Sequence, residues 1–225
     1  MFVHGGAFVG GNRRGPGGSP FYDNIMLFAA RNGMVGVNTT YRLAPQNPWP
    51  AGAQDLGAAV RWASENIAAH GGDPARVFLM GHSAGAVHVA SYVAHRQFHG
   101  PKRIGLAGAI LLSGLYDLTS MTAGGPEKAY FGEDTSKYAE RSSLAGLLAA
   151  PIPLMAVYAE LDPAFFHQQG KQLADALYSK AGREFDFFVL PKHSHMSEVY
   201  AINTNDTRLS SAILAFVKRQ ISNRP

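Results

Sequence analysis

One feature constrains the fold of this chain most. A segment with the pattern of a buried strand runs into Gly-x-Ser-x-Gly, and a helical pattern of small residues follows. The apolar run ends at Met80, the pentapeptide spans Gly81 to Gly85, and an Ala/Val-rich segment follows. A strand, sharp turn and helix of this kind form a nucleophile elbow, which presents a serine, here Ser83, to a base and a substrate carbonyl. The same pattern also occurs in plain strand-turn-helix units, so the rest of the chain has to decide.

Short apolar runs alternate with longer segments of helical period along the chain. Strands are predicted near residues 34–40, 76–81, 106–113, 153–159 and 185–190. This alternation predicts an α/β fold with a mostly parallel central sheet and helices on both faces. We expect a single domain over residues 1–225, with residues 114–150 an insertion over the active site, because loops of that length are usually functional or mobile.

The first residues resemble the tail of a strand. Met1, Phe2 and Val3 form an apolar fragment that runs directly into His4 and Gly5. Strands usually run about five or six residues, so we expect the recorded start to lie inside a structural element and the sheet to lack its N-terminal strands. Such a sheet would expose an edge strand at residues 34–40. An exposed edge can pair with another chain, so a homo-oligomer is possible.

Composition argues against several classes of protein. The formal net charge is +4 and the basic residues are scattered, so we expect no nucleic-acid partner. No apolar run reaches about eighteen residues, so no membrane span is predicted. With no cysteine there are neither disulfides nor thiolate metal sites. We expect no metal and no cofactor, and we interpret the protein as cytoplasmic.

A serine nucleophile needs a base and an acid that orients the base. His195 is a candidate base in the loop after the strand at 185–190, and His193 competes with it. Asp162 comes immediately after the strand at 153–159 and is the candidate acid, with Glu160 and a helix N-cap role for Asp162 as alternatives. Because the carboxyl ends of parallel strands face the ligand crevice, these side chains are expected to meet there.

Consecutive glycines provide candidate oxyanion donors. Gly5 and Gly6 allow backbone amides to approach a substrate without obstruction, and the Ala84 amide follows the nucleophile. Phe8 and Tyr116 are the candidates for a substrate pocket. The insertion offers further apolar residues for its wall, namely Leu115, Tyr130 and Phe131. His4 is interpreted as a structural residue that orients the glycine loop.

The order Ser83, Asp162, His195 is that of α/β-hydrolases. The chain resembles the esterase/lipase group of that fold, which includes the hormone-sensitive-lipase-like carboxylesterases and the kynurenine formamidases. The resemblance rests on His4-Gly5-Gly6-Ala7-Phe8, Tyr41-Arg42-Leu43-Ala44-Pro45, Pro48-Trp49-Pro50-Ala51 with Asp55, Gly72-Asp73-Pro74-Ala75-Arg76-Val77, Gly81-His82-Ser83-Ala84-Gly85 and Asp162-Pro163. In that family the catalytic histidine precedes an apolar residue, which implies His195 before Met196.

One departure from the family bears on the substrate. Lipase-like esterases typically show Gly-Asp-Ser-Ala-Gly-Gly, whereas this chain has His82 and Ala86, nearer the formamidase branch. We interpret the chain as a serine hydrolase that cleaves small-molecule carboxylic esters, with short acyl or aryl groups, through an acyl-enzyme. The alternatives are an arylformamidase that hydrolyses N-formylkynurenine and a non-catalytic or truncated binding protein of the same fold.

Overall fold

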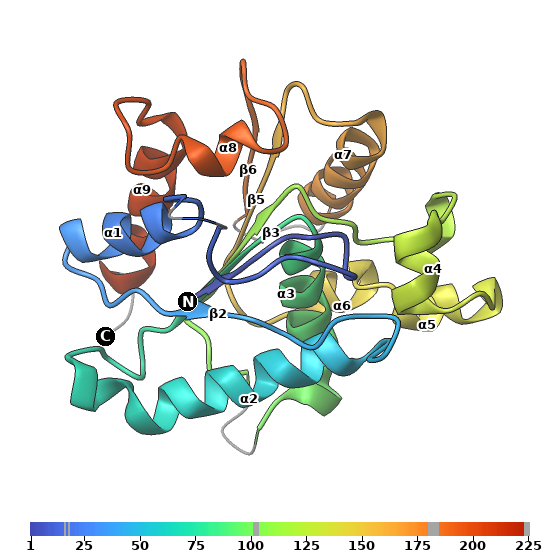
Figure 1. Ribbon diagram of the computed structural model, residues 1–225, viewed down its shortest axis with the longest axis horizontal. Coiled ribbons are helices and arrows are strands. Elements are labelled where there is room, and N and C mark those ends of the chain that lie inside the picture. The colour runs from blue at the N-terminus through green and yellow to red at the C-terminus, as the bar shows by residue number, and fades with distance from the viewer. Residues whose placement is uncertain (16, 18, 101–103, 180–184, 223–225) are drawn as a thin grey trace.

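The computed structural model describes residues 1–15, 17, 19–100, 104–179 and 185–222. In these residues six parallel strands form one sheet in the order β2-β1-β3-β4-β5-β6 (Figure 1). The strands are β1 (Phe2–Val3), β2 (Asn38–Thr39), β3 (Phe78–His82), β4 (Gly108–Leu112), β5 (Leu154–Ala159) and β6 (Phe185–Leu190). The predicted α/β fold with a parallel sheet is confirmed, and β2 lies at one edge of the described sheet as expected.

Nine helical segments of the α type connect and flank these strands in the described residues. They are α1 (Asp23–Arg31), α2 (Ala51–Asn66), α3 (Ala84–Ala94), α4 (Gly125–Phe131), α5 (Tyr138–Arg141), α6 (Leu144–Ala149), α7 (Ala164–Tyr178), α8 (Ser197–Tyr200) and α9 (Arg208–Ser222). None of the helices in the described part of the chain is both long enough and apolar enough to cross a membrane.

The central strands β3, β4 and β5 are buried on both faces, which explains why they read as continuous apolar runs. On one face Leu79 and Leu111 pack with apolar residues of α2, α3, α6 and α7. On the other face their neighbours Met80 and Ile110 pack with residues of α1, α8 and α9. Successive strand residues therefore alternate between two hydrophobic clusters, and the sheet forms the middle layer between two layers of helices (Figure 1).

A third apolar cluster joins the insertion to the end of the sheet where the strands terminate. Phe8 stacks on Tyr130 of α4 with ring centroids 4.9 Å apart, and Phe131 meets Phe8 edge-on. Ala84 and Phe166 belong to the same cluster. The aromatic side chains of the insertion are therefore buried against the molecule.

Close contact between α3 and β1 depends on Gly85. A Cβ atom added there would lie 2.2 Å from the carbonyl oxygen of Val3 and 2.5 Å from that of His4. A Cβ on Gly81 would in turn lie 2.4 Å from the Gly85 carbonyl oxygen. The two glycines of the pentapeptide thus allow the backbones of β1, β3 and α3 to meet at the turn.

We predict that Gly85→Ala destabilises the protein by about 2 kcal/mol or more, because the added methyl group would collide with backbone that cannot rotate away. Urea unfolding followed by circular dichroism measures the change. Gly125→Ala is the matched control, since nothing lies within 4 Å of a Cβ at that helical position. Equal stability of the two variants would contradict this account of the turn.

Candidate active site

Ser83 occupies the turn between β3 and α3. Its backbone has φ 56° and ψ −125°, an unfavourable conformation for a residue with a side chain. The Ser83 amide donates to the carbonyl oxygen of Leu112 at 2.9 Å, which ties the turn to the neighbouring strand β4. The serine is half-buried. This is the geometry that the pentapeptide predicts for a nucleophile elbow.

Asp162 lies just beyond β5, and three groups hydrogen-bond its carboxylate. Nδ1 of His195 lies 2.7 Å from Oδ1, while the Ser113 hydroxyl and the Ala159 amide donate to Oδ2 at 2.6 and 2.8 Å. Burial alone would raise the pKa of Asp162, but these donors outweigh it and hold the pKa below its usual range. Asp162 is thus an ionised carboxylate paired with His195. Glu160, the alternative acid, instead accepts from the Lys192 amide.

Two contacts fix the imidazole of His195: its hydrogen bond with Asp162 and a stacking contact with Phe166. Phe166 stacks on the imidazole with ring centroids 4.5 Å apart, and 22% of the histidine side chain is exposed. Within the described residues no direct hydrogen bond joins the Ser83 hydroxyl to His195. In hydrolases without bound substrate that bond is often long or poorly aligned.

His193, the competing base, has other partners. Its Nε2 lies 3.0 Å from an Asp206 carboxylate oxygen and its Nδ1 lies 3.2 Å from the Ser197 hydroxyl. The ring is buried and joins the loop after β6 to the segment before α9. The structure therefore brings His195, and not His193, to Asp162.

The glycine loop after β1 lies against Ser83. A Cβ on Gly5 would come within 3.0 Å of the Ser83 Cβ. The Gly5 amide, however, donates to the Tyr22 hydroxyl at 3.0 Å. Gly5 can bind an oxyanion only if that hydroxyl moves away. Among the described residues the Gly6 amide has no backbone acceptor, and the Ala84 amide lies in the first turn of α3, where N–H groups lack helical partners.

His4 fixes the shape of this loop. Its Nδ1 lies 2.7 Å from the Gly5 carbonyl oxygen, and its Nε2 lies 2.8 Å from the Thr40 hydroxyl. The ring stacks on Tyr41, whose hydroxyl donates to the His4 carbonyl at 3.1 Å. These contacts support the structural role that the sequence predicted for His4.

Phe8 and Tyr116, the candidates for a substrate pocket, are both buried in this structure. Phe8 is 2% exposed and lies in the cluster under α4. Tyr116 is also 2% exposed and belongs to the main core. Aromatic residues in a long insertion can either line a cavity or pack into a hydrophobic core. Here they pack into the core together with apolar residues of α4 and α6. The expected wall residues Leu115, Tyr130 and Phe131 are likewise buried.

Four exposed apolar side chains lie close in sequence to Asp162 and His195. They are Leu161, Phe165 and Met196, which are adjacent in sequence to Asp162, Phe166 and His195, and Tyr200, which lies five residues after His195 and stacks on Phe21. This group is called the apolar rim. Large side chains of this kind usually become buried, so the apolar rim offers an apolar surface beside the candidate site.

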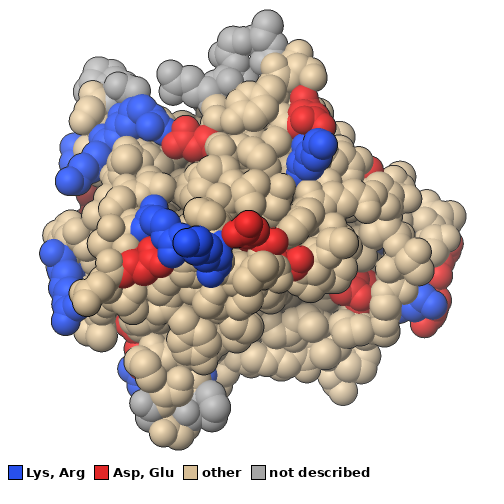
Figure 2. Space-filling view, turned by 90° about the horizontal axis from the view of Figure 1, so that it is seen from above, with Lys and Arg blue, Asp and Glu red and all other residues tan. Residues whose placement is uncertain are grey.

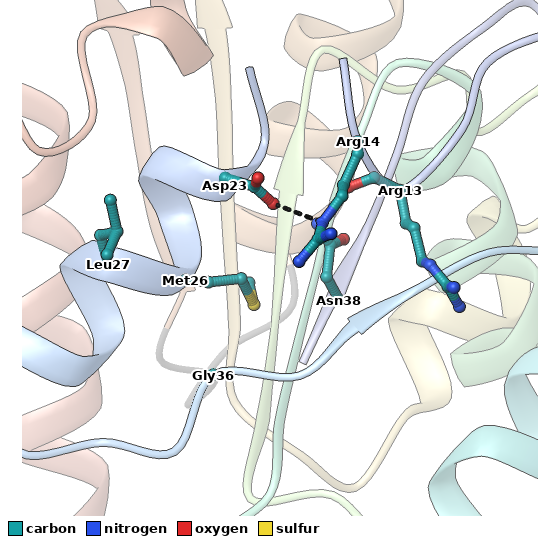
Figure 3. A pocket seen from close by; sticks show the side chains of 7 residues that line it. All are labelled: Arg13, Arg14, Asp23, Met26, Leu27, Gly36 and Asn38. Atoms are coloured by element: carbon teal, nitrogen blue, oxygen red, sulfur yellow. Dashed lines mark hydrogen bonds and ion pairs between the residues drawn. The ribbon is translucent and has the colours of Figure 1, made fainter. Parts of the chain in front are cut away.

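The conspicuous cavity of about 610 Å³ in Figure 3 lies elsewhere, between α1 and β2. Its lining includes Arg13, Arg14, Asp23 and Asn38, and none of Ser83, Asp162 or His195. Figure 3 shows Arg14 turned toward Asp23, with which it forms an ion pair at 3.3 Å. On the face shown in Figure 2, basic and acidic side chains lie interspersed.

Three residues beside the pair were not singled out from sequence: Ser113, Tyr22 and Glu198. Ser113 follows a strand and has φ 50°, so its place at the end of β4 was the only local signal. Glu198 is 0% exposed and lies on α8, three residues after His195. Burial raises the pKa of Glu198 to about 8, and the negative charge of Asp162 adds to the rise.

One group of side chains has the composition of a metal site. Ligand atoms of His82, His195 and Glu198 all lie within 4.8 Å of one another. His82 Nε2 is hydrogen-bonded to the carbonyl oxygen of His195 at 2.8 Å, so it bears a proton instead of a free lone pair. The three residues thus do not form a ready set of deprotonated ligands.

Comparisons with known proteins bear on the family and the fold of this chain. The sequence profile of the family described as alpha/beta hydrolase fold matches residues 1–198. The chain belongs to this α/β-hydrolase family. A 51-residue segment of this α/β-hydrolase is 53% identical to "Carboxylesterase NlhH" of Mycobacterium tuberculosis, covering 23% of this chain and 16% of that protein. The matched part thus spans about a sixth of that relative.

Solved structures show the same fold for this α/β-hydrolase. A "Truncated form of carbohydrate esterase from gut microbiota" has a TM-score of 0.79 at 18% identity, covering 99% of this chain and 85% of that chain. An "esterase from the bacterial hormone-sensitive lipase (HSL) family" has a TM-score of 0.71 at 23% identity, covering 98% and 75%. At these identities the likeness concerns the fold.

We predict that the free energy of unfolding of the wild type decreases, relative to that of Glu198→Gln, as the pH rises. The folded state keeps the Glu198 proton up to a pKa of about 8, whereas the ordinary pKa of a glutamate side chain is 4.5. The folded state therefore binds more protons between these values, and unfolding becomes easier as pH rises through this range. Urea unfolding from pH 5 to 9 measures the difference. Exposed Glu65, changed to Gln, is the control and should show no such trend.

Proposed function

We propose that the chain is a serine hydrolase that cleaves carboxylic esters through an acyl-enzyme. The 2.7 Å contact between Asp162 and His195, beside the elbow of Ser83, is the observation that carries the proposal. An ionised carboxylate on Nδ1 directs the free Nε2 of His195 outward and stabilises the imidazolium that forms when the base accepts a proton. The esterase names of the relatives add support.

In the mechanism that we propose, His195 acts first as a base and then as an acid in each half-reaction. Ser83 Oγ attacks the ester carbonyl while His195 Nε2 takes its proton, and the oxyanion is stabilised by the amides of Gly6 and Ala84. The tetrahedral intermediate collapses, His195 gives the proton to the leaving alcohol, and the acyl group stays on Ser83. Water then attacks the acyl carbon while His195 takes its proton, and His195 returns that proton to Ser83 Oγ as the carboxylic acid leaves.

Short acyl and aryl esters are the substrates that we propose. The apolar rim supports this class, because exposed apolar side chains that directly neighbour Asp162 and His195 in the chain favour contact with an uncharged group. We also propose that residues 114–150 border this site, since α4 packs through Phe8 and Tyr130 onto the start of α3. The fold by itself does not decide the substrate.

Turnover of p-nitrophenyl esters of graded chain length, beside N-formylkynurenine, tests the proposal. We expect the short esters to be hydrolysed fastest and Ser83→Ala to lower kcat/KM by at least about 10⁴-fold. A formamide turned over far faster than any ester would make the chain an arylformamidase. No turnover, and no labelling by a fluorophosphonate, would make it a binding protein.

His195→Ala should lower kcat by about 10⁴-fold, whereas His193→Ala should lower it by about tenfold at most. The reason is that His193 is bonded to Asp206 and Ser197 and does not contact Asp162. Steady-state kinetics with p-nitrophenyl acetate, normalised to folded protein by circular dichroism, provides the comparison. Equal losses in the two variants would show that the base is wrongly assigned.

A further inference from the structure

His82, the last residue of β3, connects two loops of the candidate site. Its ring is 1% exposed. Nε2 lies 2.8 Å from the carbonyl oxygen of His195, and Nδ1 lies 3.3 Å from the Tyr22 hydroxyl. That hydroxyl accepts from the Gly5 amide at 3.0 Å. A continuous chain of hydrogen bonds therefore runs from the glycine loop to the backbone of His195.

The donors and acceptors in this chain allow only one arrangement of protons. A carbonyl oxygen only accepts, so His82 Nε2 bears the proton and donates it to His195. Nδ1 is then free to accept from the Tyr22 hydroxyl. Burial lowers the pKa of His82 to about 4, so the ring carries a single proton at neutral pH. Burial also raises the pKa of Tyr22 to about 12, so its hydroxyl stays protonated.

The Glu198 carboxyl lies beside the proton that His82 donates. Its Oε1 is 3.3 Å from Nε2 of His82, and within the described residues neither carboxyl oxygen has a hydrogen bond of ordinary geometry. Helix α8 is fixed to α1, because the Asn24 side chain donates to the carbonyl oxygens of Val199 and Ile202, both at 2.8 Å. The titratable groups that face Glu198 are His82, Asp162, His193, His195, Tyr22 and Tyr116.

We propose that His82 is a positioning residue that ties the glycine loop to the loop of His195, and that the Glu198 carboxyl sets the direction of the His82 Nε2 proton. The proposal rests on the proposed function, since it assigns a purpose to the loops of Gly6 and His195. His82 acts on the His195 backbone and leaves the imidazole free to exchange protons with Ser83. It thereby fixes the position of the base relative to the oxyanion donors on either side of Ser83.

This tie depends on pH through Glu198. With the pKa of that carboxyl near 8, the group is neutral in the folded protein at pH 7. Above pH 8 the ionised carboxylate attracts the His82 proton away from the His195 carbonyl. The position of the His195 loop should then change.

Two substitutions of His82 separate positioning from packing. The side chain of His82→Gln is long enough to place an amide N–H near the position of Nε2, whereas His82→Asn reaches only the position of Nδ1. We expect His82→Asn to lower kcat by about tenfold or more with KM changed by less than about threefold, and His82→Gln to recover most of kcat. Tyr22→Phe, which removes the link to Gly5, should lower kcat in the same way.

Fluorophosphonate titration counts active sites, so kcat is expressed per competent molecule. If His82 had a purely structural role, its Gln and Asn variants would both melt at a lower temperature, but kcat per titrated site would stay at the wild-type value. That result would overturn the proposal, as would equal kcat values for His82→Gln and His82→Asn. An inactive wild-type chain would instead refute the proposed function.

Nuclear magnetic resonance of ¹⁵N-histidine protein tests the tie without turnover. We expect His82, assigned by the His82→Gln spectrum, to be an Nε2-protonated neutral ring from pH 5 upward. Its Nε2 resonance should shift with a midpoint near pH 8, and Glu198→Gln should abolish this shift. A ring protonated on Nδ1, or a His82 signal with no step near pH 8 in the wild type, would overturn the proposal.

Discussion

The close approach of α3 to the end of β1 is the contact on which the rest of the site depends. Gly85 lies over the carbonyl oxygens of Val3 and His4, with no room for a side chain between them. The contact sets where the helix begins and therefore where Ser83 stands. Because β1 continues into the glycine loop, the same contact places Gly5 against Ser83. Two parts of the chain about eighty residues apart are thus positioned by one backbone contact.

Charge in the site is concentrated on one carboxylate. Asp162 accepts three hydrogen bonds and keeps its charge in a buried place, whereas His82 and Glu198 nearby are held neutral by burial. If Glu198 were ionised as well, the two buried carboxylates would repel each other, and each would also lose hydration. A single fixed charge leaves Asp162 as the partner that orients the imidazole of His195.

Local patterns in the sequence predicted the features that local chemistry determines. The buried strands, the elbow at Ser83 and the acid and histidine after β5 and β6 all follow from residues near one another in the chain. Burial of Tyr116 and Phe8 could not be predicted, because it depends on how α4 and α6 fold back onto the core. Glu198 was missed for a similar reason: its burial arises where α8 meets α1, which is distant in sequence.

The two shortest strands carry the glycine loop. β1 and β2 pair through only two residues, whereas β3 with β4 and β5 with β6 pair through five and six. Cooperative opening requires less energy where fewer backbone hydrogen bonds break, so amide exchange with solvent should be fastest at this edge. Gly6, one of the two oxyanion donors that we propose, therefore follows the part of the sheet that opens most easily, whereas Ser83 and Ala84 follow the longer strand β3 at its centre.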